Sequence, residues 1–375
     1  MARAPINGDT LQWARTVSRL DRDALAKAAG TTPERITEFE AETSAPTFRQ
    51  LTLMANKLDR PLGFFFAPAP AVPDVPETAD FRGREGGGIP ADIAREMKRA
   101  EQHREAMLDL TEMPDRGWHL EPLTRDSAPD RAAELRRQFG LTERFTPPES
   151  QQNQVFNFWR GLLESHGFLV FQTTKIDLEA FRGLSIHHDS LPIIVLNGAD
   201  SASGRVFTLF HEVAHLANRT SGLCVLDEDV SEEAIANQFA ANFLMPEHLV
   251  RQHLLDTEDA LEVATQLAAA LKVSPLAAGV RLRTLGVITE QDLTDIKEQS
   301  AEIWRVVREA QKTSDGFVPP WRLRYRDLGS NYIGAIAHAL EDRRIDAMDA
   351  TYLLNARWPT VEKLLEEYLR TGGEE

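Results

Sequence analysis

The sequence predicts a multidomain protein. An all-α helix-turn-helix domain comes first, an α+β domain with a small sheet follows, and the C-terminal region is helical. Three observations lead to this prediction. The 375 residues exceed what one ordinary core accommodates. A segment rich in Pro and Gly separates two regions of different pattern. The short apolar runs that indicate strands occur only in the second region.

The composition is that of a globular protein, with 42% hydrophobic and 27% charged residues. The net charge of -16 argues against a chain that wraps nucleic acid over much of its surface. The single cysteine, Cys224, rules out an intrachain disulfide, and the first 20 residues lack the apolar core of a secretory signal. No stretch approaches the roughly 18 apolar residues of a membrane span. We therefore expect a cytoplasmic protein with no membrane partner.

Residues 1–68 are expected to form a small helical domain. Apolar residues recur at helical spacing, and the second short helix ends at Gly30, a favourable residue after a helix C-terminus. Thr32 and Pro33 begin the next helix as its N-cap and its first residue. Short helices joined by tight turns predict a helix-turn-helix within residues 10–66.

Residues 69–92 are expected to form a linker, extended where Pro is frequent and flexible where Gly is frequent. Residues 93–150 then form a helical connector. Residues 151–250 change character, because three short apolar strands are predicted there, at 168–171, 183–187 and 192–196. The last strand is continuously apolar and is expected to be central in the sheet.

Two helices follow the strands, at about residues 203–219 and 231–244, with a loop through Cys224 between them. Residues 251–298 are expected to be a helical extension of this domain, and residues 299–375 a C-terminal helical region. Aromatic residues in the latter are expected to form its core, in preference to a recognition surface; they are Trp304, Trp321, Tyr325 and Trp358.

The segment FTLFHEVAHLAN, residues 207–218, carries the most informative pattern of the chain. His211 and His215 are four apart, so a helix places both imidazoles on one face, about 6 Å apart along its axis, where they can bind one zinc ion. Glu212 lies beside them as a general base that takes a proton from water and delivers it to the leaving amine. An ordinary amphipathic helix is the alternative, and HExxH arises by chance in on the order of 1% of chains this long.

The next helix supplies the third ligand that a catalytic zinc site requires. Glu233 shares one helix face with small residues that allow close packing against the zinc helix. Glu232 lies one position round the helix and is expected to face solvent or cap the helix, so we prefer Glu233. Asn237 shares the face of Glu233 and is a candidate to support a ligand by a hydrogen bond. Zn²⁺ is the expected cofactor.

Several runs resemble the ImmA/IrrE family of metallopeptidases over about residues 150–290. They are PIIVLN, RVFTLFHEVAHL, GLC and EEAIANQFAANFLMP, with VSPLAAGVRLRTLGVIT downstream. The resemblance implies a zincin-like core with His211, His215 and Glu233 as ligands and Glu212 as the catalytic glutamate. It also implies a substrate class, helix-turn-helix repressors in stress and mobile-element regulation. Ala214 departs from the family pattern, where Gly is frequent.

Residues 10–66 are similar to XRE-type helix-turn-helix domains. The similar residues are Leu25, Ala26, Gly30, Ile36, Phe39, Glu40, Pro46 and the tail from Leu51 to Phe66. The expected recognition helix carries Glu34 and Glu38, whose carboxylates repel phosphate. We therefore favour docking to a protein over DNA binding for this region.

Further candidates for stabilising a developing oxyanion are His187 and His188, with Arg182 nearby, although a solvated strand end is the preferred interpretation. Cys224 can approach the metal as a thiolate, but a small buried residue is preferred. Together the patterns predict a zinc-dependent endopeptidase that cleaves a cytoplasmic regulatory protein. The alternative is a helix-turn-helix regulator or antitoxin-like protein that binds DNA or sequesters a partner. The sequence carries no indication of an oligomeric state.

Overall fold

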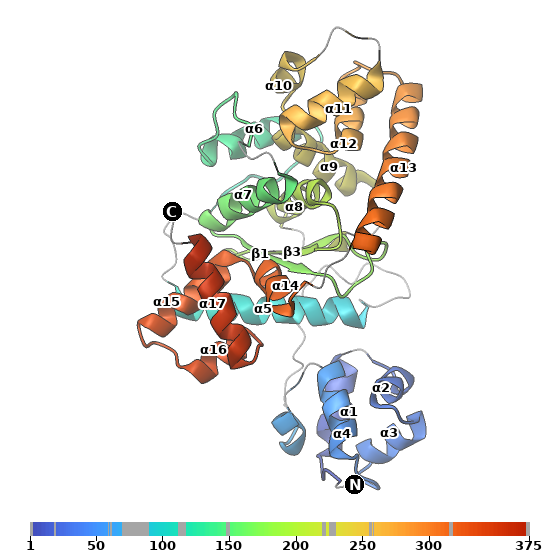
Figure 1. The fold of residues 1–375 in the computed structure, drawn as a ribbon, viewed down its shortest axis with the longest axis vertical. Helices are drawn as coiled ribbons and strands as arrows, with labels where there is room; N and C mark the ends of the chain where they lie inside the picture. Colours follow the sequence, from blue (N-terminus) through green and yellow to red (C-terminus); the bar gives the residue numbers. More distant parts are fainter. Residues whose placement is uncertain are drawn as a thin grey trace. The chain divides into compact units, whose positions relative to one another are not determined.

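The computed structural model of the chain describes residues 3–18, 20–58, 60, 62–69, 90–111, 118–147, 151–219, 223–224, 230–254, 257, 259–314 and 318–372. Two compact units are present, Met1–Arg99 and Ala100–Glu375 (Figure 1). Most of the predicted linker lies outside the described residues, so its extended and flexible parts stay a prediction.

The first unit contains α1 (Gly8–Val17), α2 (Arg22–Ala29), α3 (Pro33–Glu40), α4 (Phe48–Lys57) and the short 3-10 helix η1 (Leu62–Phe66). α1 begins where the Asn7 side chain accepts a hydrogen bond from the Thr10 amide. Gly30 ends α2 in the left-handed conformation, with φ of 61°, and the Thr32 side chain caps α3. These ends agree with the sequence prediction, and α2, a tight turn and α3 follow in the predicted order.

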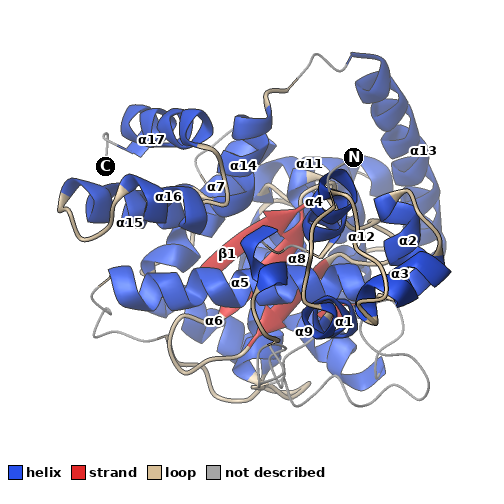
Figure 2. Cartoon of the chain, turned by 90° about the horizontal axis from the view of Figure 1, so that it is seen from below, coloured by secondary structure: helices blue, strands red, loops and turns tan. Residues whose placement is uncertain are grey.

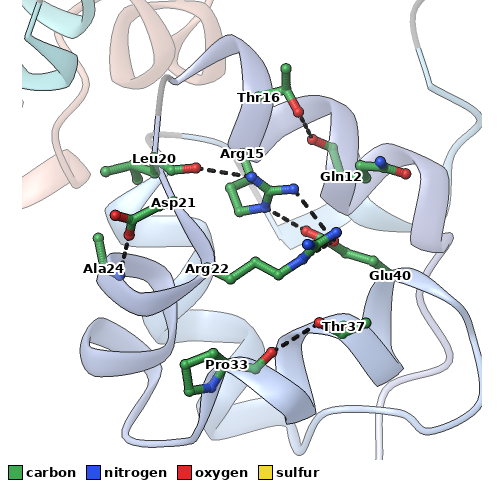
Figure 3. A network of polar contacts seen from close by, with 10 residues as sticks. All are labelled: Gln12, Arg15, Thr16, Leu20, Asp21, Arg22, Ala24, Pro33, Thr37 and Glu40. Carbon is green, nitrogen blue, oxygen red and sulfur yellow. Dashed lines mark hydrogen bonds and ion pairs between the residues drawn. The ribbon is translucent and has the colours of Figure 1, made fainter.

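Glu40 at the end of α3 joins three helices of this unit (Figure 3). Its carboxylate accepts hydrogen bonds from Arg15 of α1 at 2.5 Å and from Arg22 of α2 at 2.9 Å, and its side chain is only 4% exposed. Two guanidinium groups compensate the desolvation of one buried carboxylate. The surrounding core is apolar and includes Leu11, Leu25, Ile36, Phe39, Leu51 and Phe65.

The described residues of the second unit contain one small sheet, with strands β1 (Leu169–Thr173), β2 (Gly183–Ile186), β3 (Ile193–Asn197) and β4 (Leu223–Cys224) in the order β1-β3-β2-β4. β1 and β3 run parallel, whereas β2 is antiparallel to both β3 and β4. All residues of β1, β2 and β3 are buried. The predicted central place of the third strand is confirmed. The segment through Cys224, predicted as a loop, instead contains the short strand β4.

Helices cover both faces of this sheet (Figures 1 and 2). α7 (Gln152–Ser165) and α8 (Ala202–Ala217) lie on one face, and α14 (Pro320–Leu328) contacts β1 from the other. α9 (Val230–Leu244) packs along α8, and α6 (Ala128–Gln138) packs along α9. α8 therefore lies between helices and sheet, which explains why nearly every side chain in its second half is buried.

The remaining helices are α5 (Ala91–Leu110), α10 (Glu247–Gln252), α11 (Ala260–Leu271), α12 (Pro275–Thr284), α13 (Glu290–Ser314), α15 (Ser330–Glu341), α16 (Ala347–Leu353) and α17 (Trp358–Gly372). The prediction that the sequence segments before and after the strands are mostly helical is thus confirmed. No single described helix has the length and apolar composition needed to cross a membrane. The pair α11 and α12 meets those criteria only together, with a bend of 110° between them.

The aromatic residues of the C-terminal region correct one expectation. Trp321, Tyr325 and Trp358 are half-buried, while the side chain of Trp304 lies outside the described residues. The interior of this region is instead formed by residues that include Tyr332, Ile333, Ile336, Val361 and Leu364. The half-buried aromatic rings are therefore available to line surface cavities.

Candidate metal centre

The helix α8 presents His211, Glu212 and His215 inside the second unit. It begins at Ser201, whose side chain accepts a hydrogen bond from the Gly204 amide, and continues without interruption to Ala217. His211 and His215 are each 3% exposed, and Glu212 is fully buried. The apolar neighbours in the helix pack into the main core, so the polar triplet is held on a rigid element.

The helix α9 brings Glu233 to the two histidines. Ala236 and Ala240 of α9 are buried against the core, so small side chains do occupy the face that packs along α8. The Glu233 carboxylate lies 3.2 Å from the Nε2 atoms of both His211 and His215. Glu232 is exposed, in agreement with its expected solvent position.

The three side chains converge with a geometry suited to a metal ion. The two Nε2 atoms are 3.0 Å apart, and one ligand atom from each of His211, His215 and Glu233 lies within 4.8 Å of the others. Tetrahedral zinc with bonds of about 2.0–2.1 Å places its ligand atoms about 3.3 Å from one another. The donor set, two imidazole nitrogens and one carboxylate, therefore fits zinc in both chemistry and spacing.

Asn237 holds one of these histidines in the form that a metal requires. Its Oδ1 lies 3.0 Å from Nδ1 of His211. An amide oxygen accepts only, so Nδ1 donates, and the lone pair is left on Nε2, which faces His215 and Glu233. The supporting hydrogen bond expected for Asn237 is thus present in the structure.

The charge on Glu233 is also favourable for a cation. Burial opposes ionisation of this carboxyl, but hydrogen bonds and charge from His211 and His215 outweigh burial and hold its pKa well below the ordinary range. Its side chain is 22% exposed, more than either histidine. Glu233 is therefore the most exposed of the three side chains.

Gly183, which no sequence motif indicated, also lies at this centre. A Cβ atom at this position of β2 would lie 2.8 Å from Oε1 of Glu212 and 2.7 Å from Cγ2 of Thr208. The buried Glu212 carboxylate therefore rests directly against the backbone of β2, and only glycine permits this approach. A glycine that begins a buried strand was the available signal.

The structure gives the secondary candidates other surroundings. His188 Nε2 is paired with Glu101 of α5 at 3.0 Å, and Arg182 approaches Asp200 at 3.4 Å. Burial lowers the pKa of His187, which favours its neutral form. An oxyanion role for these residues stays a prediction, and a paired His188 weakens it. Cys224 lies in β4 opposite Gly183, and its side chain is not among those described.

Comparison with known proteins bears on the same segment. Residues 163–283 match the family model of peptidase M78, described as the IrrE N-terminal-like domain. No curated protein matches the chain. Two solved structures also match the chain. They are PlcR of Bacillus thuringiensis in complex with the peptide PapR7 and DNA, and ComR from Streptococcus suis.

PlcR is 14% identical, with 83% of this chain and 99% of that chain covered, and ComR is 13% identical, with 100% and 98% covered. Both have a TM-score of 0.16, too low to support any argument about this fold. The family match, by contrast, includes all three residues of the candidate metal group, which are His211, His215 and Glu233. The segment that carries His211, His215 and Glu233 is therefore similar to the IrrE N-terminal-like peptidase domain, in support of a relation to the ImmA/IrrE family.

Proposed function

We propose that this protein is a zinc-dependent endopeptidase. The observation that carries the proposal is the convergence of two imidazole nitrogens and the Glu233 carboxylate beside the buried Glu212. The match of residues 163–283 to a peptidase domain supports it. A helix that merely satisfied two polar contacts would have no need of a third acidic ligand, a histidine fixed by Asn237 and a glutamate fitted against Gly183.

The residues divide the catalytic work as follows. His211, His215 and Glu233 would hold the metal, and bound zinc would supply Lewis acidity toward the substrate carbonyl and the attacking water. Asn237 orients His211. Glu212 accepts the proton of the attacking water and returns it to the nitrogen of the leaving amine, which completes hydrolysis of the peptide bond. The low exposure of this carboxylate keeps competing bulk water away from the transferred proton.

The proposed substrate is a regulatory protein such as a helix-turn-helix repressor, as the family resemblance implies. The first unit is proposed as an XRE-type domain that docks a protein. Its helix α3 carries the carboxylates of Glu34 and Glu38, and Arg35 pairs with Glu38 at 2.5 Å. Arg15 and Arg22 are engaged by Glu40. The one cation of α3 is therefore already paired, and the helix presents net negative charge to a phosphate backbone.

Affinity capture from the native host tests the proposal. The Glu212→Gln variant keeps the metal ligands but removes the proton acceptor, so we expect it to retain a protein that the wild type releases as fragments. Mass spectrometry of the bound material identifies both. Glu232→Gln is a matched control, because it alters an exposed neighbour of Glu233, and it should behave as wild type. A partner held intact and equally by wild type and Glu212→Gln would contradict proteolysis.

A second candidate function is regulation by binding, either to DNA or to a sequestered partner. The order of α2, a tight turn and α3 in the first unit favours keeping it. A gel-shift with the protein's own upstream DNA at low salt tests the DNA form. A specific shift that Glu212→Gln does not alter would support it, and no shift would exclude it.

A further inference from the structure

A cavity in the second unit lies away from the metal group, between α7 and the C-terminal helices α14 and α17. Its volume is about 610 Å³, which is within the range of small-ligand sites. α7 contributes Arg160, Gly161 and Glu164 to the lining. α14 contributes residues that include Trp321 and Arg322.

α7 lines this cavity with polar side chains that internal contacts hold in place. Arg160 and Glu164 form an ion pair of 2.9 Å, and each side chain is only 6% exposed. Arg160 also donates to the carbonyl oxygens of Val170 and Arg326. Because every one of these contacts is internal, the pair is a fixed part of the cavity wall.

Gly161, an exposed residue in the middle of α7, borders open space in the cavity. A Cβ atom at Gly161 would meet nothing within 4 Å, although this residue lines the cavity. Glycine inside a helix costs about 1 kcal/mol relative to alanine, so helix stability does not account for it. Open space next to Gly161 is therefore a place where a ligand can sit.

The charge of the lining favours an anion. Four arginines and two glutamates line the cavity. Arg326 is paired with Asp327 at 2.6 Å and Arg370 with Glu367 at 2.6 Å. When Asp327 is counted as well, the four arginines exceed the three carboxylates by one positive charge.

Arg322 is the guanidinium best placed to meet a ligand. Its Cζ lies 5.3 Å from the centroid of the Trp321 ring. No ion pair with a described residue holds it, although its charge helps to lower the pKa of Glu367 on the same cavity wall. Arg322 is exposed to solvent. Guanidinium groups bind carboxylates, sulfonates and phosphates through two parallel hydrogen bonds, and the adjacent Trp321 and Tyr325 rings can pack against a planar group.

We propose that this cavity binds a small anionic ligand with a planar apolar group, with the anion at Arg322 and the planar group between Trp321, Tyr325 and Gly161. Nothing in the metal group or its mechanism uses these residues. The site is therefore additional to the proposed peptidase centre.

Direct contacts join the cavity to α8, the helix that carries His211 and His215. Trp159, adjacent to Arg160 in α7, packs edge-on against Phe210 at 5.2 Å, and Phe210 directly precedes His211. A second connection runs through Gln172, which donates to the Arg326 carbonyl and accepts from Arg205 of α8. We expect ligand binding to shift zinc affinity, an expectation that also rests on the proposed function.

Fluorescence titration of the full chain with 1-anilinonaphthalene-8-sulfonate tests the binding site. This probe is a planar aromatic anion, and N-phenyl-1-naphthylamine is its neutral counterpart. We expect saturable binding of the sulfonate at one site, weakened about tenfold by Arg322→Gln because one charged hydrogen-bond partner is lost. The neutral probe should lose nothing from the same change.

Two further variants complete the test. Gly161→Met fills the open space and should abolish binding of the sulfonate with no fall in melting temperature. Arg357→Gln is the matched control, since Arg357 lines a separate cavity with Trp358, and it should leave the affinity unchanged. Equal affinities for wild type, Arg322→Gln and Gly161→Met would overturn the proposal. So would an equal loss in Arg357→Gln.

The connection to the metal helix has its own readout. Sulfonate affinity is compared between protein loaded with zinc and protein stripped by a chelator, and zinc affinity is measured with and without the probe. We expect both to change by the same factor, about fivefold or more. Unchanged affinities would overturn the connection. Because neither measurement uses cleavage, failure here is distinct from failure of the peptidase proposal.

Discussion

Gly183→Ala should separate the position of Glu212 from the binding of metal. The added Cβ would lie 2.7 Å from Cγ2 of Thr208 and 2.8 Å from Oε1 of Glu212. Carbon atoms in contact normally lie about 3.5–4.0 Å apart, so β2 and α8 must separate, or the carboxylate must turn, by about 1 Å. A displacement of that size at a catalytic group lowers the rate about a hundredfold. The overpacked core should cost about 1–3 kcal/mol of stability.

The assay is cleavage of the captured protein by purified variant and wild type at equal zinc content. We expect Gly183→Ala to retain zinc, because its clash is with Glu212 and Thr208, and to lose most of its cleavage rate. Addition of Thr208→Ser removes the methyl contact, so it should recover part of the stability but little of the rate. Gly161→Ala is the control for glycine replacement, since its Cβ would meet nothing. Gly183→Ala protein that folds, binds zinc and cleaves at the wild-type rate would refute the reasoning.

Three other predictions concern single side chains. Glu233→Gln should reduce the amount of bound zinc, measured by mass spectrometry of the metal, because it removes the anionic ligand. The control Glu232→Gln should keep its zinc, since Glu232 is exposed. An equal loss of zinc in both variants would contradict the assignment of Glu233 as a ligand. Asn237→Ala should weaken zinc affinity about 10- to 100-fold in a chelator competition, since His211 loses its fixed tautomer, and unchanged affinity would refute this. Glu40→Gln should lower the unfolding free energy by about 3 kcal/mol in denaturant titration of the first unit's transition, because two guanidinium groups lose their buried partner; a change below about 1 kcal/mol would contradict the role given to that pair.

The parts of the fold that follow from local pattern could be predicted from the sequence. The helical spacing around His211 and His215 and the continuous apolar run of β3 are local signals, and both elements lie where they were expected. The choice of Glu233 over Glu232 followed from the face it shares with small residues, and the structure places its carboxylate beside both histidines.

Features that depend on distant packing could not be predicted. β4 has only two residues, too few for any periodic pattern, and it exists because it pairs with β2. The need for glycine at position 183 arises from the approach of α8 to that strand. Trp321 was expected in a core, but it lines a cavity formed by helices far apart in the sequence. Lys272 ends α11 with φ of 60°, where glycine would be the usual choice.

Cleavage of the captured partner by purified wild type and by Glu212→Gln, both loaded with equal zinc, tests the central claim most directly. Mass spectrometry of the products locates any new chain termini. We expect defined fragments with wild type, loss of these fragments in Glu212→Gln, and loss again when wild type is treated with a chelator. Identical fragments from both proteins, or a partner that stays intact with both, would contradict the assignment of Glu212 and the metal group as a peptidase centre.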